Sequence, residues 1–357
     1  MSEDLVQRKG LYALVTLACV VIVVAGFKAA SSLMLPLLVA VFLATLSVPP
    51  MRRLKNLGVP TGPAIGIVVI VAFGIVTVVS AVIGNSLRQF QDSLPFYRNR
   101  LNEILNDGIR WLQDRGLDIE TRALSDMIDT GFLLELVGDT AAGMLGVLSN
   151  MLLVVLMLVF MLFEANQLPS KLRRALKKPD ADLSDFTGSA ERVQKYLSIK
   201  SMTSLATGAL VAILTAAIGL DFPLLWGLVA FLFNFVPSIG SVIAAVPAVL
   251  LGLVQLGVWP AMLVAIGYLA INLTIGNAIE PRLMGRRLGL STLVVFLSMV
   301  FWGWVWGPVG MLLSVPLTVI LKIALEHSDD FHWLAVLLGP GEESSTGLSP
   351  PRRSAGV

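Results

Sequence analysis

The sequence predicts an all-α polytopic membrane protein with about eight transmembrane helices, and three observations lead to this fold class. Only 14% of the 357 residues are charged, whereas soluble domains carry about 25%. Seven intervals contain no Lys, Arg, Asp or Glu: residues 11–27, 29–51, 56–87, 140–163, 201–220, 222–279 and 288–321. A crossing needs about 20 apolar residues, so these intervals supply seven or more. The basic residues between them also fall on alternate sides of the membrane, as the positive-inside rule requires.

The same composition excludes several function classes. A net charge of +2 is too small for a protein that neutralises several phosphates of a nucleic acid. Cys19 is the single cysteine, which excludes an internal disulfide and a cysteine-ligated metal site. No GxxxxGK(S/T), HExxH, GxSxG or GxGxxG motif occurs, and these motifs mark phosphate loops and common enzyme sites. We therefore expect no enzyme activity, no cofactor and no metal.

Residues 1–85 form the first expected unit, with three membrane helices at about 11–27, 33–48 and 62–85. Arg8 and Lys9 precede the first helix, which places the N-terminus in the cytoplasm. A second basic group, at residues 52–55, marks the return of the chain to that side. The third helix then leads outside.

Residues 86–142 form an expected extracytoplasmic insert. They include 6 basic and 10 acidic residues, a net charge of −4 that suits the external side. Apolar residues recur there at helical spacing, which predicts an amphipathic helix: Leu101, Ile104, Leu105, Trp111 and Leu112. A fourth helix at about 143–163 returns to a basic cytoplasmic loop, and these two segments make up the next unit, 143–200.

Residues 201–325 form the expected transport core, which begins with a helix at about 202–220. Residues 222–255 then remain apolar for 34 positions but are interrupted by Pro237 and Gly240. Proline removes a backbone donor, and lipid cannot satisfy the polar groups that such a break exposes. A re-entrant helical hairpin that enters and leaves on the outside, with its tip near the midplane, explains this stretch.

A second broken stretch follows at residues 288–321, with its interruption at Gly307, Pro308 and Gly310. An Ile-Gly or Val-Gly pair is followed in both stretches by Val-Pro and an aliphatic run. The arginines between the stretches place the second entrance on the cytoplasmic side. Two broken hairpins that enter from opposite faces are typical of secondary transporters. The alternative is that each stretch makes two full crossings joined by a tight turn.

Five polar residues of the core are candidates for binding a substrate or an ion, because polar groups at membrane depth are costly and usually functional. Asn234 and Ser238 flank the first break, whereas Asn272, Asn277 and Glu280 lie on or at the end of the helix at about 260–279. Amide oxygens suit a hydrated cation or a polyol, and a carboxylate can carry a proton or a sodium ion.

In a regular α-helix, Asn272, Gly276 and Glu280 share one face, with Asn277 one turn before the carboxylate. Two alternatives remain open for these residues. Glu280 lies near Arg282 and Arg286, so it forms either a structural salt bridge or the coupling site. The asparagines either bind the solute or join neighbouring helices, which would contribute about 1 kcal/mol each.

The last expected unit, residues 326–357, is a cytoplasmic tail. Its final part is rich in Pro, Gly and Ser, which is typical of disorder.

Five segments of the core, at residues 236–240, 246–251, 280–285, 307–311 and 315–317, read VPSIG, VPAVLL, EPRLMG, GPVGM and VPL. In these segments the core resembles the autoinducer-2 exporter-like family of bacterial membrane proteins. This resemblance implies an eight-helix inner-membrane permease that is homo-oligomeric, with pentamers reported for members. Some members export a small signalling molecule, and others exchange sodium or lithium for protons. Members often carry Tyr or a similar residue where Ser238 stands.

The sequence thus predicts a secondary transporter in the bacterial inner membrane that exports a small polar solute or signalling molecule, coupled to protons or sodium. Both termini are expected in the cytoplasm, and the expected partners are the solute, the ion, membrane lipid and further copies of the chain. Two alternatives remain. The protein could be a membrane scaffold whose insert binds a partner, or a passive channel.

Overall fold

The computed structural model describes residues 2–115, 151–175, 184–237, 239–284, 289–326, 328 and 331–339. Over these residues the chain is helical and contains no strand, which confirms the predicted all-α class. Five of the described helices are long and apolar enough to cross a membrane. Ser238, the second part of the predicted insert (116–142) and the tail beyond residue 339 lie outside the described residues.

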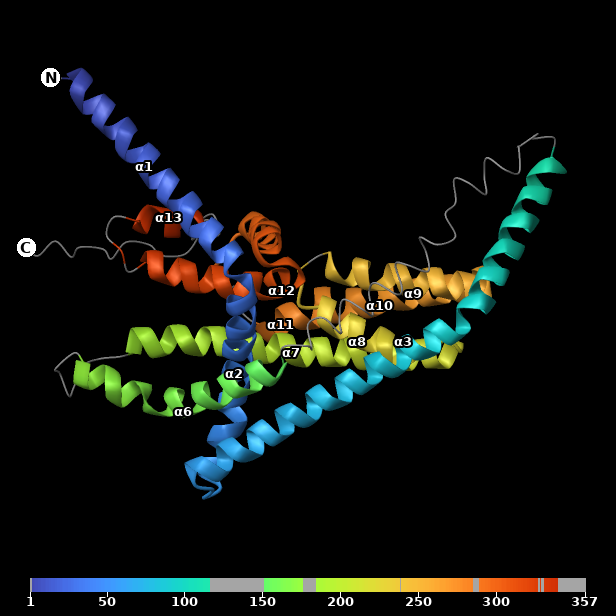
Figure 1. Ribbon diagram of the computed structural model, residues 1–357, viewed down its shortest axis with the longest axis horizontal. Helices are drawn as coiled ribbons and strands as arrows, with labels where there is room; N and C mark the ends of the chain where they lie inside the picture. The colour runs from blue at the N-terminus through green and yellow to red at the C-terminus, as the bar shows by residue number, and fades with distance from the viewer. Residues whose placement is uncertain are drawn as a thin grey trace, which may run out of the picture.

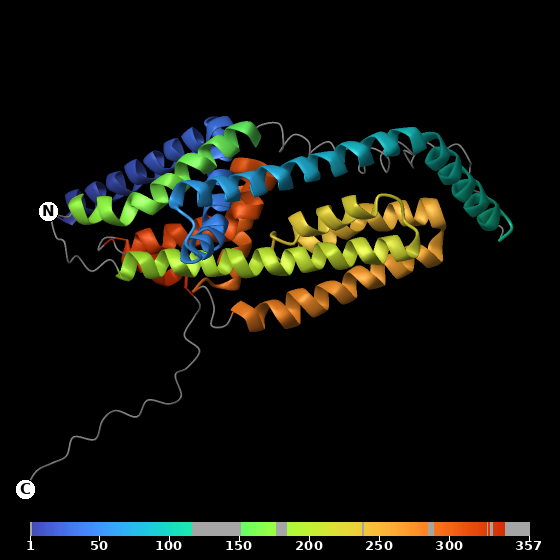
Figure 2. The same ribbon diagram turned by 90° about the horizontal axis from the view of Figure 1, so that it is seen from below.

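The N-terminal helices are longer than the sequence indicates. α1 (Ser2–Ala29) and α2 (Ser31–Asn56) lie almost end to end, and α2 runs across α7 (Ser184–Ile218) in Figure 1 and is seen nearly end-on in Figure 2. α3 (Thr61–Gln113) has 53 residues, so at 1.5 Å per residue it is about 80 Å long. It passes through the predicted boundary at residue 85 without a break, and its far end extends away from the other helices (Figure 2).

α6 (Met151–Ala175) packs along α2 and α3. Small and aliphatic side chains from the three helices form one buried cluster: Ala44, Met51, Ala64, Ile65, Val68, Leu158 and Leu162. These helices therefore form one side of the molecule, next to the helices of the core.

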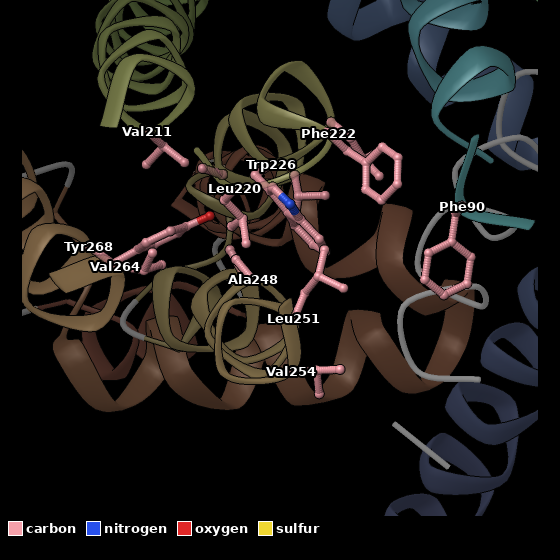
Figure 3. Packing of buried hydrophobic residues seen from close by; sticks show 14 of the residues in the cluster. Phe90, Val211, Leu220, Phe222, Trp226, Ala248, Leu251, Val254, Val264 and Tyr268 are labelled. Atoms are coloured by element: carbon pink, nitrogen blue, oxygen red, sulfur yellow. The ribbon is translucent and has the colours of Figure 1, made fainter. Parts of the chain in front are cut away.

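α7 is the central helix of the core. It packs most extensively against α8 (Pro223–Phe233), and α9 (Gly240–Leu256) and α10 (Val258–Asn272) complete the group. Gly208 of α7 faces Gly227 of α8 so closely that a methyl group on Gly208 would lie 2.6 Å from the Gly227 carbonyl oxygen. A cluster of buried apolar side chains that includes Trp226 fills the space between these helices (Figure 3).

The first predicted hairpin is a pair of antiparallel helices, α8 and α9. The backbone N–H of Asp221, just before α8, donates to Gln255 Oε1 at the end of α9 (3.0 Å), so the two outer ends lie together. At the break, a methyl group on Gly240 would collide with the carbonyl oxygen of Phe233. The turn therefore requires glycine at this position.

The second predicted hairpin is α12 (Thr292–Glu326), which is interrupted where Trp306 and Gly307 leave helical geometry; Gly307 has φ +64°. The Ser298 hydroxyl donates to the carbonyl oxygen of Ser314 (2.9 Å). In an unbroken helix these residues would lie about 24 Å apart, so the two halves fold back on each other. Gly310 repeats the role of Gly240, because a methyl group there would collide with the Trp302 carbonyl oxygen.

Both interruptions therefore occur at the predicted residues, and both produce paired helices. Whether each pair enters and leaves the membrane on one side remains a prediction, as does the total of about eight crossings.

Between the two hairpins, α10 does not continue as a regular α-helix. Residues Leu273–Ile279 form a π-helix, η1, followed by the short α11 (Glu280–Met284). The α-helical spacing that was assumed for Asn272, Gly276 and Glu280 does not hold through this segment, since π-helical hydrogen bonds join residues five apart. The described chain ends with α13 (His332–Leu337), which packs against α12.

Candidate functional site

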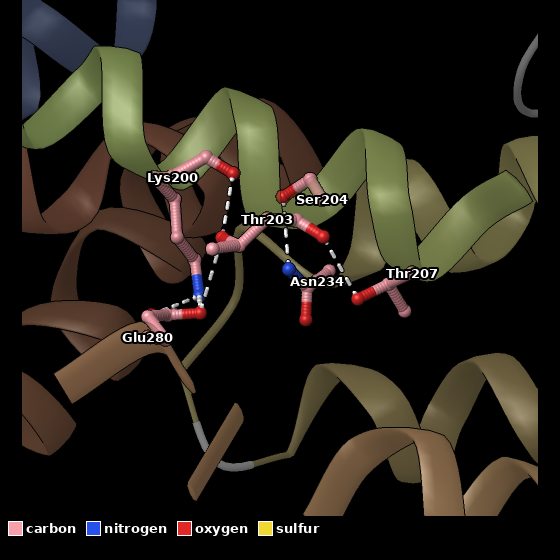
Figure 4. A network of polar contacts seen from close by, with 6 residues as sticks. All are labelled: Lys200, Thr203, Ser204, Thr207, Asn234 and Glu280. Atoms are coloured by element: carbon pink, nitrogen blue, oxygen red, sulfur yellow. Dashed lines mark hydrogen bonds and ion pairs between the residues drawn. The ribbon is translucent and has the colours of Figure 1, made fainter. Parts of the chain in front are cut away.

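One face of α7 carries a row of polar residues at the centre of the core (Figure 4). Lys200, Thr203, Ser204 and Thr207 follow the spacing i, i+3, i+4 and i+7, which places them on one side of the helix. All four are buried. We call these four residues, together with Asn234 and Glu280, the polar seam.

Lys200 and Glu280 form the charged end of the seam. The Lys200 ammonium donates to both carboxylate oxygens, at 2.7 and 2.9 Å. The two side chains are only 7% and 14% exposed. A buried ion pair of this kind loses most of its hydration, so it is stable only with good geometry and additional hydrogen bonds. Thr203 supplies one of these, because its hydroxyl lies 3.3 Å from Glu280 Oε2.

The threonines of the seam also bond to their own helix. The Thr203 hydroxyl lies 3.0 Å from the Lys200 carbonyl oxygen, and its single hydrogen can serve either that carbonyl or Glu280 at one time. Thr207 donates to the Thr203 carbonyl oxygen at 2.9 Å. The seam can thus exchange hydrogen-bond partners without leaving a hydroxyl hydrogen unpaired.

Asn234 connects the seam to the first hairpin. It follows the last residue of α8, directly before the break, and its Nδ2 donates to the Ser204 hydroxyl at 2.9 Å. Both side chains are buried. A movement of the first hairpin would therefore change the hydrogen bonds of the seam.

The structure brings only two of the five predicted binding residues into the seam. Asn234 and Glu280 face α7, but Asn277 is exposed. Asn272 is half-buried, and its Oδ1 covers Gly276, since a methyl group there would lie 3.0 Å from that oxygen. Asn272 itself therefore occupies the space over Gly276.

The partner of Glu280 also differs from the arginines that the sequence places near it. Arg282 is exposed and Arg286 lies outside the described residues, whereas Lys200 is 80 positions away in the sequence. The sequence prediction does not include four residues of the seam: Lys200, Thr203, Ser204 and Thr207. Their i, i+3, i+4, i+7 spacing was the available signal, but Lys200 fell at the boundary with the basic loop.

Asp221 is held by hydrogen bonds at the base of the first hairpin. Its Oδ2 accepts a hydrogen bond from the Tyr97 hydroxyl at 2.6 Å, and its carbonyl oxygen accepts one from Trp226 Nε1 at 2.8 Å. α3 is thereby joined to the outer ends of α8 and α9.

The second hairpin contains a separate group of buried hydroxyls that bond to one another. Ser298 contacts Thr318, and Trp302 Nε1 donates to the Thr318 hydroxyl at 3.1 Å. Trp302 stacks on Trp306, whose Nε1 donates to the carbonyl oxygen of Phe27 in α1 (3.0 Å). These bonds hold the two halves of α12 and the end of α1 together, so we assign them a structural role.

No group of three or more His, Cys, Asp or Glu side chains that could hold a metal occurs in the described part of the chain. The seam consists instead of one carboxylate, one ammonium, an amide and hydroxyls. Such a set can form hydrogen bonds with a small polar solute, and its carboxylate can bind a proton or a monovalent cation.

Comparison with known proteins agrees with the resemblance seen in the sequence. Residues 17–330 match the model of a family described as AI-2E family transporter. The chain is 38% identical to the AI-2 transport protein TqsA of Escherichia coli K12 over 338 residues, which cover 95% of this chain and 98% of that relative. YhhT of the same strain is 38% identical over 95% of this chain and 97% of its own length. A relative from Haemophilus influenzae is 38% identical over 92% and 97% of the two chains. All three are named as transport proteins.

Proposed function

We propose that this chain, which belongs to the AI-2E transporter family, is a secondary transporter that exports a small polar solute past the polar seam and couples this export to protons or sodium. The observation that carries the proposal is the buried ion pair of Lys200 and Glu280 beside the tip of the first hairpin. Charged groups inside a membrane bundle are costly and usually mark an ion or substrate path.

The two hairpins provide the moving parts in this proposal. α8 has 11 residues, or about 17 Å at 1.5 Å per residue, which is too short to cross about 30 Å of hydrocarbon. This length favours a re-entrant first hairpin over two full crossings. Re-entrant helices whose tips meet near the midplane form the binding sites of many secondary transporters. In this proposal the fold has about eight transmembrane helices, and two of them are re-entrant hairpins.

Coupling follows from the position of Lys200. Its ammonium occupies the place that an external cation would take at Glu280, at 2.7 and 2.9 Å from the carboxylate oxygens. A proton or sodium ion that reaches Glu280 competes with this ammonium. The displaced Lys200 then needs other partners, and the solute can provide them. We also assign Ser238 a contact with the solute. Asn277, which is exposed, and Asn272, which lies over Gly276, are assigned weaker contributions to binding.

The cellular setting of the proposal is the bacterial inner membrane, with several crossings and both termini in the cytoplasm. The basic residues at 52–55 and 171–178 support this orientation, because short cytoplasmic loops are rich in Lys and Arg. The helices expose many large apolar side chains, which lipid or further copies of the chain would cover, and the family resemblance makes a pentamer the first assembly to test.

The experiment is solute flux in proteoliposomes. The name of the relative TqsA makes autoinducer-2 the first solute to test. We expect flux that responds to an imposed proton or sodium gradient, and we expect Glu280→Gln to lose this response. Glu103→Gln is the matched control, since Glu103 forms an exposed ion pair with Arg100.

Three results would contradict the proposal. Flux that ignores both gradients would remove the coupling. Ion currents of single-channel size would identify a passive channel instead of a carrier. A cellular phenotype that is lost when residues 86–142 are deleted but is unchanged by Glu280→Gln would favour a scaffold.

A further inference from the structure

The C-terminal helix α13 presents an apolar face that no described residue covers. Trp333, Val336 and Leu337 follow the spacing i, i+3, i+4 and so share one side of the helix. They are 59%, 64% and 66% exposed. On the opposite side, Ala335 is 1% exposed. The exposed face of α13 is therefore apolar, whereas a helix at a water-exposed surface normally exposes polar side chains.

α13 is fixed to the base of the second hairpin. The backbone N–H of Ser291, just before α12, donates to the carbonyl oxygen of Leu338 at 3.1 Å. Leu338 also packs against a buried cluster from α7, α12 and the residues just before α12: Tyr196, Leu197, Leu290, Val315 and Val319. The position of α13 is therefore fixed relative to both the hairpin and the central helix.

The base of this hairpin is where its apolar stretch ends. Lys322 donates to the carbonyl oxygen of Gly289 at 2.6 Å and pairs with Glu326 at 3.3 Å, so both ends of the hairpin reach charged groups at the same level. The six residues of α13 extend about 9 Å and cannot cross a bilayer. The apolar face thus lies at the boundary between apolar and charged parts of the molecule.

We propose that α13 lies in the membrane interface and inserts Trp333, Val336 and Leu337 into the lipid. Tryptophan is enriched at this depth, and short amphipathic helices bind there through a buried apolar face. Continuity with the long apolar α12, which ends five residues before α13, favours lipid over a protein partner. Because Ser291 bonds to Leu338, the lipid contact holds the base of the second hairpin at one membrane surface.

The test is the depth of a fluorescent label at position 337. Cys19 is the single cysteine and is exposed, so a Cys19→Ala background allows Leu337→Cys to be labelled alone with an environment-sensitive fluorophore. The protein is reconstituted in vesicles with or without lipids that carry a nitroxide near the headgroup. Arg110→Cys in the same background is the control, because Arg110 is 76% exposed in a charged part of α3.

We expect the nitroxide lipids to quench the label at 337, and aqueous iodide to quench it several-fold less than the label at 110. Iodide quenching at 337 equal to that at 110 would overturn the proposal, since the face would then lie in water. Shielding from both quenchers would also overturn it, because protein, such as a second copy of the chain, would then cover the face.

Discussion

Lys200 of α7 and Glu280 of α11 form a buried ion pair across 80 positions of sequence, at 2.7 Å between Nζ and Oε1. The pair joins the central helix to the segment that follows the π-helix. It lies one helical turn from Ser204, which binds Asn234 at the first break. Charge, hairpin and central helix thus meet in one place.

Removal of either charge should destabilise the protein more than removal of both. Glu280→Gln leaves the buried Lys200 ammonium without its counter-charge, and the loss of one partner of a buried ion pair lowers the free energy of unfolding by about 3–5 kcal/mol. The double variant Lys200→Met with Glu280→Gln should recover much of the stability that the single variant loses, because no unpaired charge is then buried. Thermal unfolding in detergent measures the effect. Arg100→Gln, in an exposed pair, should change stability by less than about 1 kcal/mol. A double variant as unstable as the single ones would show that the pair is not the cause.

The glycines at the two breaks should not tolerate alanine. A methyl group at Gly240 or Gly310 collides with a backbone carbonyl oxygen, which cannot rotate away as a side chain can. We expect each substitution to destabilise the protein by about 1–3 kcal/mol or more. Gly74→Ala in α3 is the control, because no atom lies within 4 Å of the added methyl group; a helical alanine there should stabilise by about 0.5–1 kcal/mol. Equal effects at Gly74 and Gly240 would contradict this account.

Removal of the hydroxyl group should affect protein stability differently at two tyrosines, Tyr97 and Tyr268. Tyr97→Phe removes the hydrogen bond to the Asp221 carboxylate, and bonds to charged groups contribute about 1.5–3 kcal/mol. The buried Tyr268 hydroxyl has no partner among the described residues, so Tyr268→Phe should leave stability unchanged or raise it. Chemical unfolding of both variants against the parent tests the contrast. A cost at Tyr268 similar to that at Tyr97 would mean that its hydroxyl is bonded.

Transport should depend on Asn234 far more than on Asn277. Asn234 is buried and donates to Ser204, whereas Asn277 is exposed. We expect Asn234→Ala to lower the rate of solute flux by about tenfold, the equivalent of 1.4 kcal/mol, and Asn277→Ala to leave the rate near that of the parent. Initial rates in proteoliposomes, normalised to reconstituted protein, give the comparison. A larger loss of flux in Asn277→Ala than in Asn234→Ala would instead support the binding face that the sequence predicts around Asn272, Asn277 and Glu280.

The sequence predicted the features that depend on local backbone chemistry. Proline lacks an N–H and glycine permits φ values that other residues avoid, so the interruptions at Pro237 and Gly307 were visible without a structure. The same local reasoning missed the continuity of α3 through residue 85 and the π-helix at Leu273–Ile279. At the first of these, Gly84 and Pro95 lie inside α3 without interrupting the helix. At the second, the sequence predicts regular α-helical spacing, whereas the hydrogen bonds follow the π pattern.

By itself, the sequence determined that the protein is a helical membrane protein and that two of its apolar stretches are interrupted at Pro/Gly positions. Composition and backbone sterics act within a few residues, so they can be evaluated without a structure. Only the tertiary structure decided which charges and amides meet. Arg282 is two residues from Glu280, yet it is exposed, and the carboxylate pairs with Lys200. The physical reason is that a buried charge must find a partner in space, and the packing of α7 against α11, not distance along the chain, provides it.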